Sequence, residues 1–490
     1  MAEISLTPYA PAIIESMRAI GYSLESAVAD IIDNSIAAGA SKINVYFNPL
    51  DEPFIAIIDD GRGMEQGELT EAMRHGGRVL NVQRQPTDLG RFGLGLKTAS
   101  LSQCRRLTVV SMKDSDSKPS ARIWDLDLIE KKEDWILYIP DSDAEISEIP
   151  YVKLLVEQGH GTIVLWQQLD RLSAGEIGIL EAFDEKMPRV REHLSLVFHR
   201  YLSGESDLSS IKITMNDQSV LPADPYFLKS KATQQLYTED FKIENQTIRV
   251  TPFILPHISK LTEKERKEVT ANSDFRMAQG FYVYRNRRLI LHGTWFRMAR
   301  TDELTKLARV QVDIPNALDH LWTLDVKKSS AYPPEVVRSN LKRIVERIAD
   351  HSIQVYKYRG RSALTKEVHT WVREQTRTGI IYKINREHPV IMDLLSSGSD
   401  IDKRRLATLL AVLESTYPIN ALYNDMASDQ AASTEGMDER ALRELASELY
   451  RTAQSWPDKG ISLIERLPFI EPFSHNAELT RQIVTEMKNA

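Results

Sequence analysis

The chain has 490 residues, enough for about three domains of ordinary size. Its 62 basic and 69 acidic side chains give a net charge of −7, so bulk charge does not favour a nucleic acid, and only a local basic patch would bind one. The single cysteine, Cys104, excludes an intramolecular disulfide and a cysteine-rich zinc site, and we expect a reducing compartment, the cytoplasm. Because the N-terminus lacks a secretion pattern and apolar runs are short, we expect no membrane partner.

The first 204 residues combine helical patterns with strands. Residues 10–40 predict two helices, the second beginning at the N-cap residue Ser23 and ending near Gly39. Short apolar or alternating runs then predict strands at 42–47, 54–58, 107–112, 122–128, 135–139 and 162–166. Residues 76–95 contain several glycines and no periodicity, which is typical of a long functional or disordered loop.

Two more regions follow in the chain. A long helix is predicted at 175–202, and strands at 211–215, 246–252, 281–285 and 310–314 indicate a second mixed domain over 205–332. Helical patterns dominate from residue 333 to 490, at 335–355, 363–376, 402–414, 438–453 and 476–488. The sequence therefore predicts an α+β protein of three parts, 1–204, 205–332 and 333–490.

The helix after Ser23 carries the first candidate site residues. Asp30 and Asn34 are one turn apart, so a carboxylate and a carboxamide lie on the same helical face. An exposed polar stripe would show the same spacing. The pair therefore needs support from other parts of the sequence.

Two segments that contain glycines supply this support. Asp59 ends a strand and enters a turn with Gly61 and Gly63, where the backbone can come close to a ligand. The segment GRFGLGLKTAS, at 90–100, is a glycine-rich loop that opens a helix, so backbone amides and Lys97 can face a phosphate. The loop matches neither the P-loop nor the Rossmann fingerprint.

A fourth segment, GHGTIVLW, places Thr162 at the start of a strand. In their order and spacing the four segments resemble the GHKL ATPases, a superfamily that includes gyrase B subunits, MutL mismatch-repair proteins, ninety-kilodalton heat-shock chaperones, histidine kinases and MORC proteins. The sequences of these segments are most similar to those of the bacterial MORC-like and MutL-like branches. YRNRRLI at 284–290 and WTLDVKK at 322–328 resemble the transducer domain of the same superfamily.

The resemblance implies a Bergerat-type ATP-binding α/β sandwich, followed by a transducer-like domain of the ribosomal-protein-S5 type and a mostly helical C-terminal region. In that fold Asp30 would orient the water that attacks the γ-phosphate, Asn34 would bind Mg²⁺, and Asp59 would accept the adenine amine. Either Lys327 or Lys328 would sense the γ-phosphate, although two solvated lysines would look the same. The other implied ATP-binding residues are Gly61, Gly63, Met64, Gly90, Arg91, Phe92, Gly93, Leu94, Gly95, Leu96, Lys97 and Thr162.

The sequence also departs from the pattern of these relatives. Many hydrolysing MutL-type and MORC-type proteins have Glu where this chain has Asp30, one methylene shorter, so we expect slow hydrolysis. Basic clusters at 285–300 and 338–361 would contact DNA or form solvated faces, and the acidic total favours solvated faces.

The resemblance implies a cytoplasmic, Mg²⁺-dependent ATPase whose N-terminal domains dimerise when ATP binds. Such a protein would be a nucleotide-gated clamp or switch that acts on DNA or on a protein client. MORC-like bacterial members are suspected of a role in restriction or phage defence. The alternative is an interaction protein that senses ATP and does not hydrolyse it.

Overall fold

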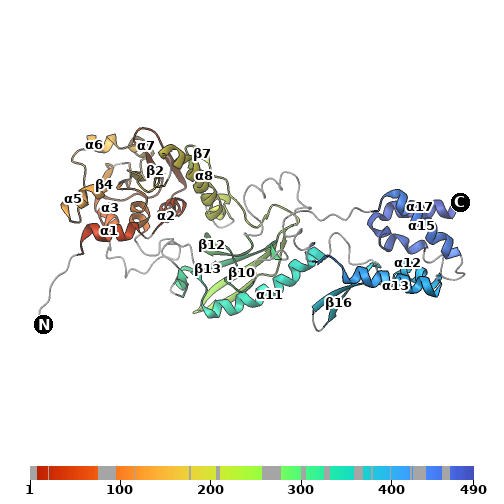
Figure 1. The fold of residues 1–490 in the computed structure, drawn as a ribbon. Coiled ribbons are helices and arrows are strands. Elements are labelled where there is room, and N and C mark those ends of the chain that lie inside the picture. The colour runs from red at the N-terminus through yellow and green to blue at the C-terminus, as the bar shows by residue number, and fades with distance from the viewer. Residues whose placement is uncertain are drawn as a thin grey trace, which may run out of the picture. The chain divides into compact units, whose positions relative to one another are not determined.

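The computed structural model has two compact units, Met1–Tyr356 and Lys357–Ala490, of which Figure 1 shows the secondary structure. The residues that it describes are 8–19, 21–74, 95–115, 117–175, 178–205, 210–256, 278–299, 305–319, 321–324, 331–357, 368–376, 379–397, 399–419, 422, 437–454 and 464–489.

A mixed sheet is the centre of the N-terminal part of the first unit. Among the described residues it has seven strands, in the order β4 (Ser120–Asp125), β3 (Arg106–Met112), β5 (Gly161–Gln167), β2 (Phe54–Asp59), β1 (Lys42–Asn48), β6 (Lys212–Met215) and β7 (Gln218–Ser219). The β1–β6 pair is parallel and the other pairs are antiparallel. This arrangement confirms the mixed α+β class expected from the sequence.

Alternation along β2 shows why helices cover both faces of this sheet. Ile55 and Ile57 belong to one buried cluster and Ala56 and Ile58 to another, because successive side chains of a strand point to opposite faces. The first cluster includes residues of α1 (Ala10–Arg18), α2 (Leu24–Ala37), α3 (Gln66–Met73), α4 (Gly95–Leu101), α5 (Leu126–Lys132) and α8 (Ile179–Val197). The second includes α7 (Val152–Gln158), against which α6 (Asp143–Glu148) packs.

Two strands of this region are shorter than expected. The strand expected at 122–128 ends at Asp125, because the Asp125 side chain accepts the N–H groups of Asp127 and Leu128 and thereby caps α5. The strand expected at 135–139 is present as a bridge between Ile123 and Tyr138.

The first unit also contains a second sheet. Its described strands follow the order β12 (Arg288–Thr294), β11 (Gly280–Arg285), β13 (Ala308–Ile314), β10 (Gln246–Ile254) and β8 (Gln234–Gln235), and β9 (Glu239–Ile243) also pairs with β10. A long helix, α11 (Glu335–Lys357), runs along this sheet (Figure 1) and buries Val337, Leu341 and Ile344 in its core. The short strands β14 (Thr323–Leu324) and β15 (Ala331–Tyr332) pair with each other.

The sheets do not divide at the residues expected from the sequence. β6 and β7 pair within the first sheet, so that sheet continues beyond residue 204 to Ser219. Before β6 in the chain, α8 is followed by α9 (His199–Ser203). Helix α11 belongs to the second core, although the sequence placed it in the C-terminal region that begins at 333.

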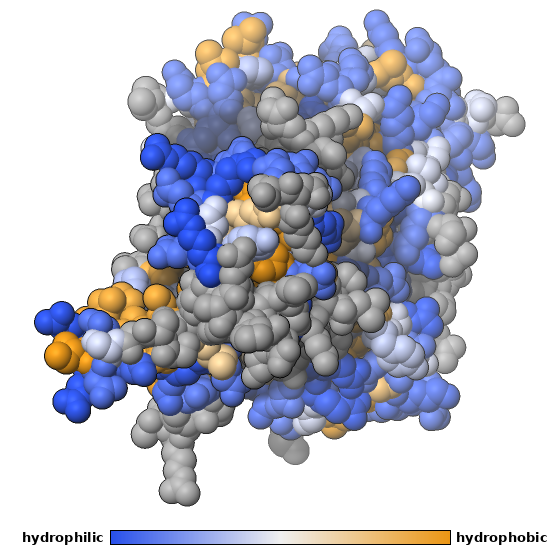
Figure 2. All heavy atoms as spheres, turned by 90° about the vertical axis from the view of Figure 1, so that its right-hand side faces the viewer, coloured by the Kyte–Doolittle hydropathy of each residue, from blue (hydrophilic) through white to orange (hydrophobic). Residues whose placement is uncertain are grey.

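The second unit is mostly helical, with one hairpin. Its described elements are β16 (Trp371–Thr376), β17 (Gly379–Ile384), α12 (Pro389–Ser397), α13 (Asp400–Ser415), α15 (Glu439–Gln454) and α17 (Ala477–Asn489). The helix expected at 363–376 is wrong over 371–376, because that segment pairs as β16 with the apolar strand β17. No helix among the described residues is long and apolar enough to span a membrane. Seen from the right-hand side of Figure 1, the surface is largely hydrophilic with separate apolar patches (Figure 2).

Candidate functional site

Asp59 is held by hydrogen bonds to both oxygens of its carboxylate. It ends β2 opposite Thr162 of β5. Its Oδ1 accepts the Gly61 N–H at 2.9 Å and its Oδ2 accepts the Ser35 hydroxyl at 2.7 Å. The side chain is only 6% exposed, and burial raises the pKa of its carboxyl above the usual value. Because each carboxylate oxygen can accept two hydrogen bonds, Asp59 has the capacity to accept an amine donor as well.

Two positions near Asp59 require glycine, one in the turn after β2 and one at the start of β5. Gly63 has φ +63°, and a Cβ there would lie 1.9 Å from the Met112 carbonyl oxygen at the end of β3. Gly161 has φ +125°, and its Cβ would lie 2.0 Å from the Asp59 carbonyl oxygen. The backbones of β2, β3 and β5 therefore approach so closely here that side chains do not fit between them.

Hydroxyl groups connect this turn to the neighbouring strands. The Ser111 hydroxyl accepts the Met64 N–H at 2.9 Å and lies 2.9 Å from the Thr162 hydroxyl. The structure thus brings Gly61, Gly63, Met64 and Thr162 together around Asp59, and their role in nucleotide binding stays a prediction. It adds Ser35 and Ser111, which sequence reasoning missed; the position of Ser35 directly after Asn34 was the one signal.

Helix α2 supplies the other two predicted polar groups. Its N-cap, Ser23, accepts the Ser26 N–H, and an apolar stripe of Leu24, Val28 and Ile31 packs into the core. Asn34 is exposed and Asp30 is buried one turn earlier. The Tyr22 hydroxyl donates to Asp30 Oδ2 at 3.1 Å.

Lys97 has a different environment from the one predicted. It is only 3% exposed, and its ammonium donates to the carbonyl oxygens of Ala72 and Arg74 at 2.9 Å each. Burial lowers its pKa to about 8. In this structure Lys97 therefore joins the end of α3 to α4, and its role in holding phosphate stays a prediction.

The remaining predicted residues fall into two groups. Gly95 and Leu96 begin α4, where Leu96 packs against the first core. Seven others lie outside the described residues: Gly90, Arg91, Phe92, Gly93, Leu94, Lys327 and Lys328.

The side chains present fit a Mg²⁺–nucleotide complex. In the described part of the chain no three His, Cys, Asp or Glu residues are grouped as a metal site. Mg²⁺ typically takes one or two protein oxygens and keeps phosphate and water for its other positions. The carboxamide oxygen of the exposed Asn34 meets that requirement, and the buried carboxylate of Asp59 suits the adenine amine.

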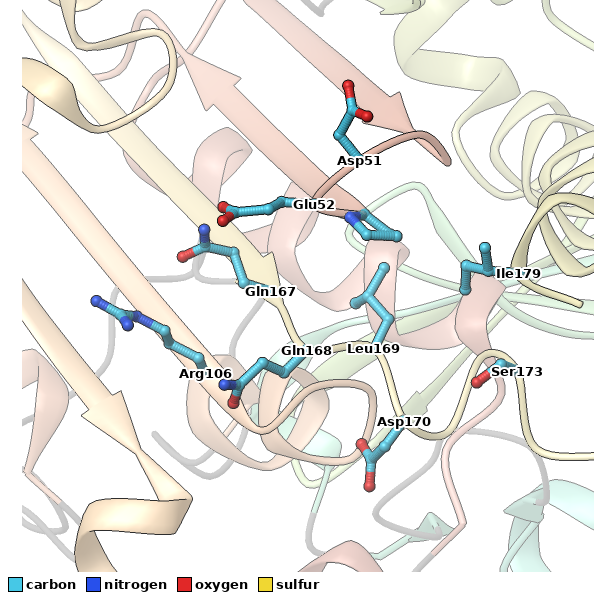
Figure 3. Close-up of a pocket in the computed structure, with 10 residues that line it drawn as sticks. Asp51, Glu52, Arg106, Gln167, Gln168, Leu169, Asp170, Ser173 and Ile179 are labelled. Atoms are coloured by element: carbon cyan, nitrogen blue, oxygen red, sulfur yellow. The ribbon is translucent and has the colours of Figure 1, made fainter.

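A separate hollow of about 600 Å³ lies at the other end of the same strands (Figure 3). Arg106 begins β3 and Gln167 ends β5, and these two residues pair in the sheet. The acidic lining residue Asp170 is paired with the buried Arg18 of α1. This hollow is therefore no part of the site around Asp59.

Comparison with known proteins identifies the same segment. A model of the histidine kinase-, DNA gyrase B- and HSP90-like ATPase family matches residues 22–162. The chain is 32% identical over 90 residues to the ATPase morc-1 of Caenorhabditis elegans, covering 18% of this chain and 10% of that protein. It is 33% identical over 87 residues to the DNA mismatch repair protein MutL of Rhodospirillum rubrum, covering 18% of this chain and 14% of that protein. For the DNA mismatch repair protein MutL of Shewanella woodyi the identity is 28% over 127 residues, which cover 26% of this chain and 18% of that protein.

A solved structure, described as the N-terminal domain of a DNA repair protein, aligns with 68% of this chain and 93% of its own at 15% identity and a TM-score of 0.39. The matched segments span between 10% and 18% of the curated relatives. The family match contains Asp30, Asn34, Asp59 and Thr162. Residues 22–162 thus match the histidine kinase-, DNA gyrase B- and HSP90-like ATPase family, which belongs to the GHKL superfamily.

Proposed function

We propose that this chain binds ATP with Mg²⁺ at the site between α2 and β2 and hydrolyses its β–γ bond. The observation that carries the proposal is the buried Asp59 carboxylate, held by Ser35 and Gly61 within the ATPase-family segment. Its spare acceptor positions suit the adenine amine. Asn34, exposed one turn beyond Asp30, would supply an oxygen to Mg²⁺, which stabilises the phosphate charge.

Asp30 would act as the general base of the reaction. Its carboxylate orients a water, whose oxygen forms a bond to the γ-phosphorus while the bond from that phosphorus to the β–γ bridging oxygen breaks. Asp30 takes the proton of the water and passes it to solvent, and ADP and phosphate leave. Aspartate has a shorter reach than glutamate, so turnover is expected to be slow.

We also propose that ATP binding dimerises the N-terminal unit and that the protein acts on DNA. The DNA assignment rests on two relatives that are named DNA mismatch repair proteins. Light scattering with a non-hydrolysable ATP analogue should give twice the monomer mass, and duplex DNA should raise ATP turnover. An unchanged mass would reject dimerisation, and turnover insensitive to DNA would favour a protein client.

Nucleotide titration of the purified chain tests the site. Asp59→Asn should weaken ATP binding between tenfold and about 100-fold, because a hydrogen bond to a buried charge is lost. Asp60→Asn is the matched control, since Asp60 bonds Ser41 and the Lys42 N–H instead. Asn34→Ala should remove the effect of Mg²⁺ on affinity. Wild-type affinity in Asp59→Asn would contradict the assignment.

A further inference from the structure

Two acidic residues of α2 meet one arginine of the second sheet. Arg288, the first residue of β12, lies 3.0 Å from an oxygen of Asp33 through its Nε and 3.6 Å from Asp30 Oδ1 through its Nη2. The three side chains are 7% exposed or less. The sequence placed Arg288 in a basic cluster, whereas the structure places it against the predicted general base.

The two contacts of Arg288 differ in strength. The Asp33 contact has hydrogen-bond geometry, because Nε donates to Asp33 Oδ1 at 3.1 Å. The 3.6 Å contact to Asp30 is too long for a hydrogen bond and acts by charge. Asp33 therefore anchors the guanidinium beside the Asp30 carboxylate. The Tyr22 hydroxyl fixes the other Asp30 oxygen at 3.1 Å.

The second sheet determines the position of Arg288. A two-residue turn joins β11 to β12, with φ of 49° at Asn286 and 66° at Arg287. The Asn286 carbonyl accepts the Tyr201 hydroxyl of α9 at 2.7 Å, and Arg288 Nη1 donates to the Leu289 carbonyl. The guanidinium also lies 5.9 Å from the centre of the Phe198 ring. A displacement of this turn would move the guanidinium relative to Asp30.

We propose that Arg288 is a positioning residue for Asp30, through which the second sheet controls the rate of ATP hydrolysis and not the affinity for ATP. This inference rests on the proposed function. Arg288 keeps the Asp30 carboxylate in the orientation that accepts a water proton, a role that matters more for aspartate because its chain is short. Asp59 is held by Ser35, farther along the same helix, and by the Gly61 N–H rather than by Arg288, so we expect adenine binding not to depend on Arg288.

Steady-state kinetics and ATP titration of the full chain test this. Arg288→Met should lower kcat between tenfold and about 100-fold and leave the ATP Kd unchanged. This fall is part of the rate enhancement that a general base contributes. Arg288→Lys should recover part of the rate, since it keeps the charge but cannot contact both carboxylates as the guanidinium does. Arg249→Met is the matched control, because Arg249 lies on the same sheet in an exposed pair with Asp240. This variant should hydrolyse ATP at the wild-type rate.

Loss of Arg288 also removes a positive charge beside two buried carboxylates, which can destabilise the fold. The double variant Arg288→Met with Asp33→Asn removes one of these two negative charges and should recover part of the lost melting temperature but not kcat. Wild-type kcat in folded Arg288→Met would overturn the proposal, and so would a parallel fall of kcat and ATP affinity in the double variant. A wild-type chain that neither binds nor hydrolyses ATP would instead reject the proposed function itself.

Discussion

Single backbone positions determine the shape of the turn after β2. Gly63 lets residues 61–64 pass the end of β3, and the Met64 N–H then reaches the Ser111 hydroxyl. The positive φ of Gly63 alone costs a residue with a Cβ about 1 kcal/mol or more. The close carbonyl oxygen of Met112 adds a steric clash, so the site depends on glycine here.

Gly63→Ala should therefore lower the free energy of unfolding by about 2 kcal/mol or more and weaken ATP binding. Gly67→Ala is its control, because Gly67 lies in α3 with open space around its Cβ position. Alanine there should be neutral or up to about 1 kcal/mol stabilising. Denaturant unfolding checks both variants. Equal stabilities for the two would show that the turn tolerates a side chain.

The sequence was informative for residues that lie in short local motifs. Asp30 and Asn34 could be paired from helical spacing, and Asp59 from its place between a strand and a glycine turn. Tyr22 and Arg288 could not be assigned, because their contacts with Asp30 depend on tertiary packing. Arg288 is 258 positions away from Asp30, and no periodicity connects residues at such a separation.

At the scale of elements, the ends of α3 and α4 are joined by a buried charge. The Lys97 ammonium donates to two carbonyl groups at the end of α3. Burial disfavours the charged form, so its pKa falls to about 8. The connection between α3 and α4 is therefore sensitive to pH in the alkaline range.

Comparing wild type with Lys97→Met should reveal this sensitivity. Between about pH 8 and 10.5 the unfolded chain keeps a proton on Lys97 that the folded chain has released, so wild-type stability rises relative to the variant. The rise should be up to about 3 kcal/mol. Burial also raises the pKa of Tyr201 to about 12, an opposite effect that cancels in the comparison. A difference in the free energy of unfolding between wild type and Lys97→Met that stays constant across this pH range would contradict the expected proton release. Lys153→Met serves as a control at an exposed lysine.

Elements with local signals were easier to predict than those formed by distant pairing. The apolar segments of β2 and β5 were recognised as strands, and Ser23 marked the start of α2. The sequence predicts a helix over 371–376, because the pairing of this segment with β17 cannot be recognised from its own residues. The strand predicted at 211–215 was likewise placed in the second domain, whereas β6 joins β1 of the first sheet from about 170 residues away.

At the scale of the whole molecule, buried polar contacts join the two sheets of the first unit. Arg200 of α9 pairs with Asp313 of β13, and the His199 ring lies 2.8 Å from the Tyr284 hydroxyl of β11. Burial lowers the pKa of His199 to about 3, so the ring is neutral at physiological pH. Together with the contacts of Arg288 to Asp30 and Asp33 of α2, these contacts connect the second sheet to the helix that carries Asp30.

Truncation tests where this first unit ends. A chain of residues 1–356 should fold and bind ATP, because it retains α11 and the second core. A chain of residues 1–332 lacks Val337, Leu341, Ile344 and Ile348, whose burial contributes on the order of 6 kcal/mol. It should melt at a lower temperature or aggregate. Equal melting curves for both truncations would show that α11 is dispensable for the second core.

The rate of ATP hydrolysis by the purified chain with Mg²⁺ tests the central claim most directly, with Asp30→Asn as the comparison and ATP binding measured in parallel. We expect slow turnover in the wild type, a fall of about 100-fold or more in Asp30→Asn, and no change in ATP affinity. Equal rates for the two proteins, with ATP still bound, would contradict the assignment of Asp30 and leave a protein that senses ATP without hydrolysing it.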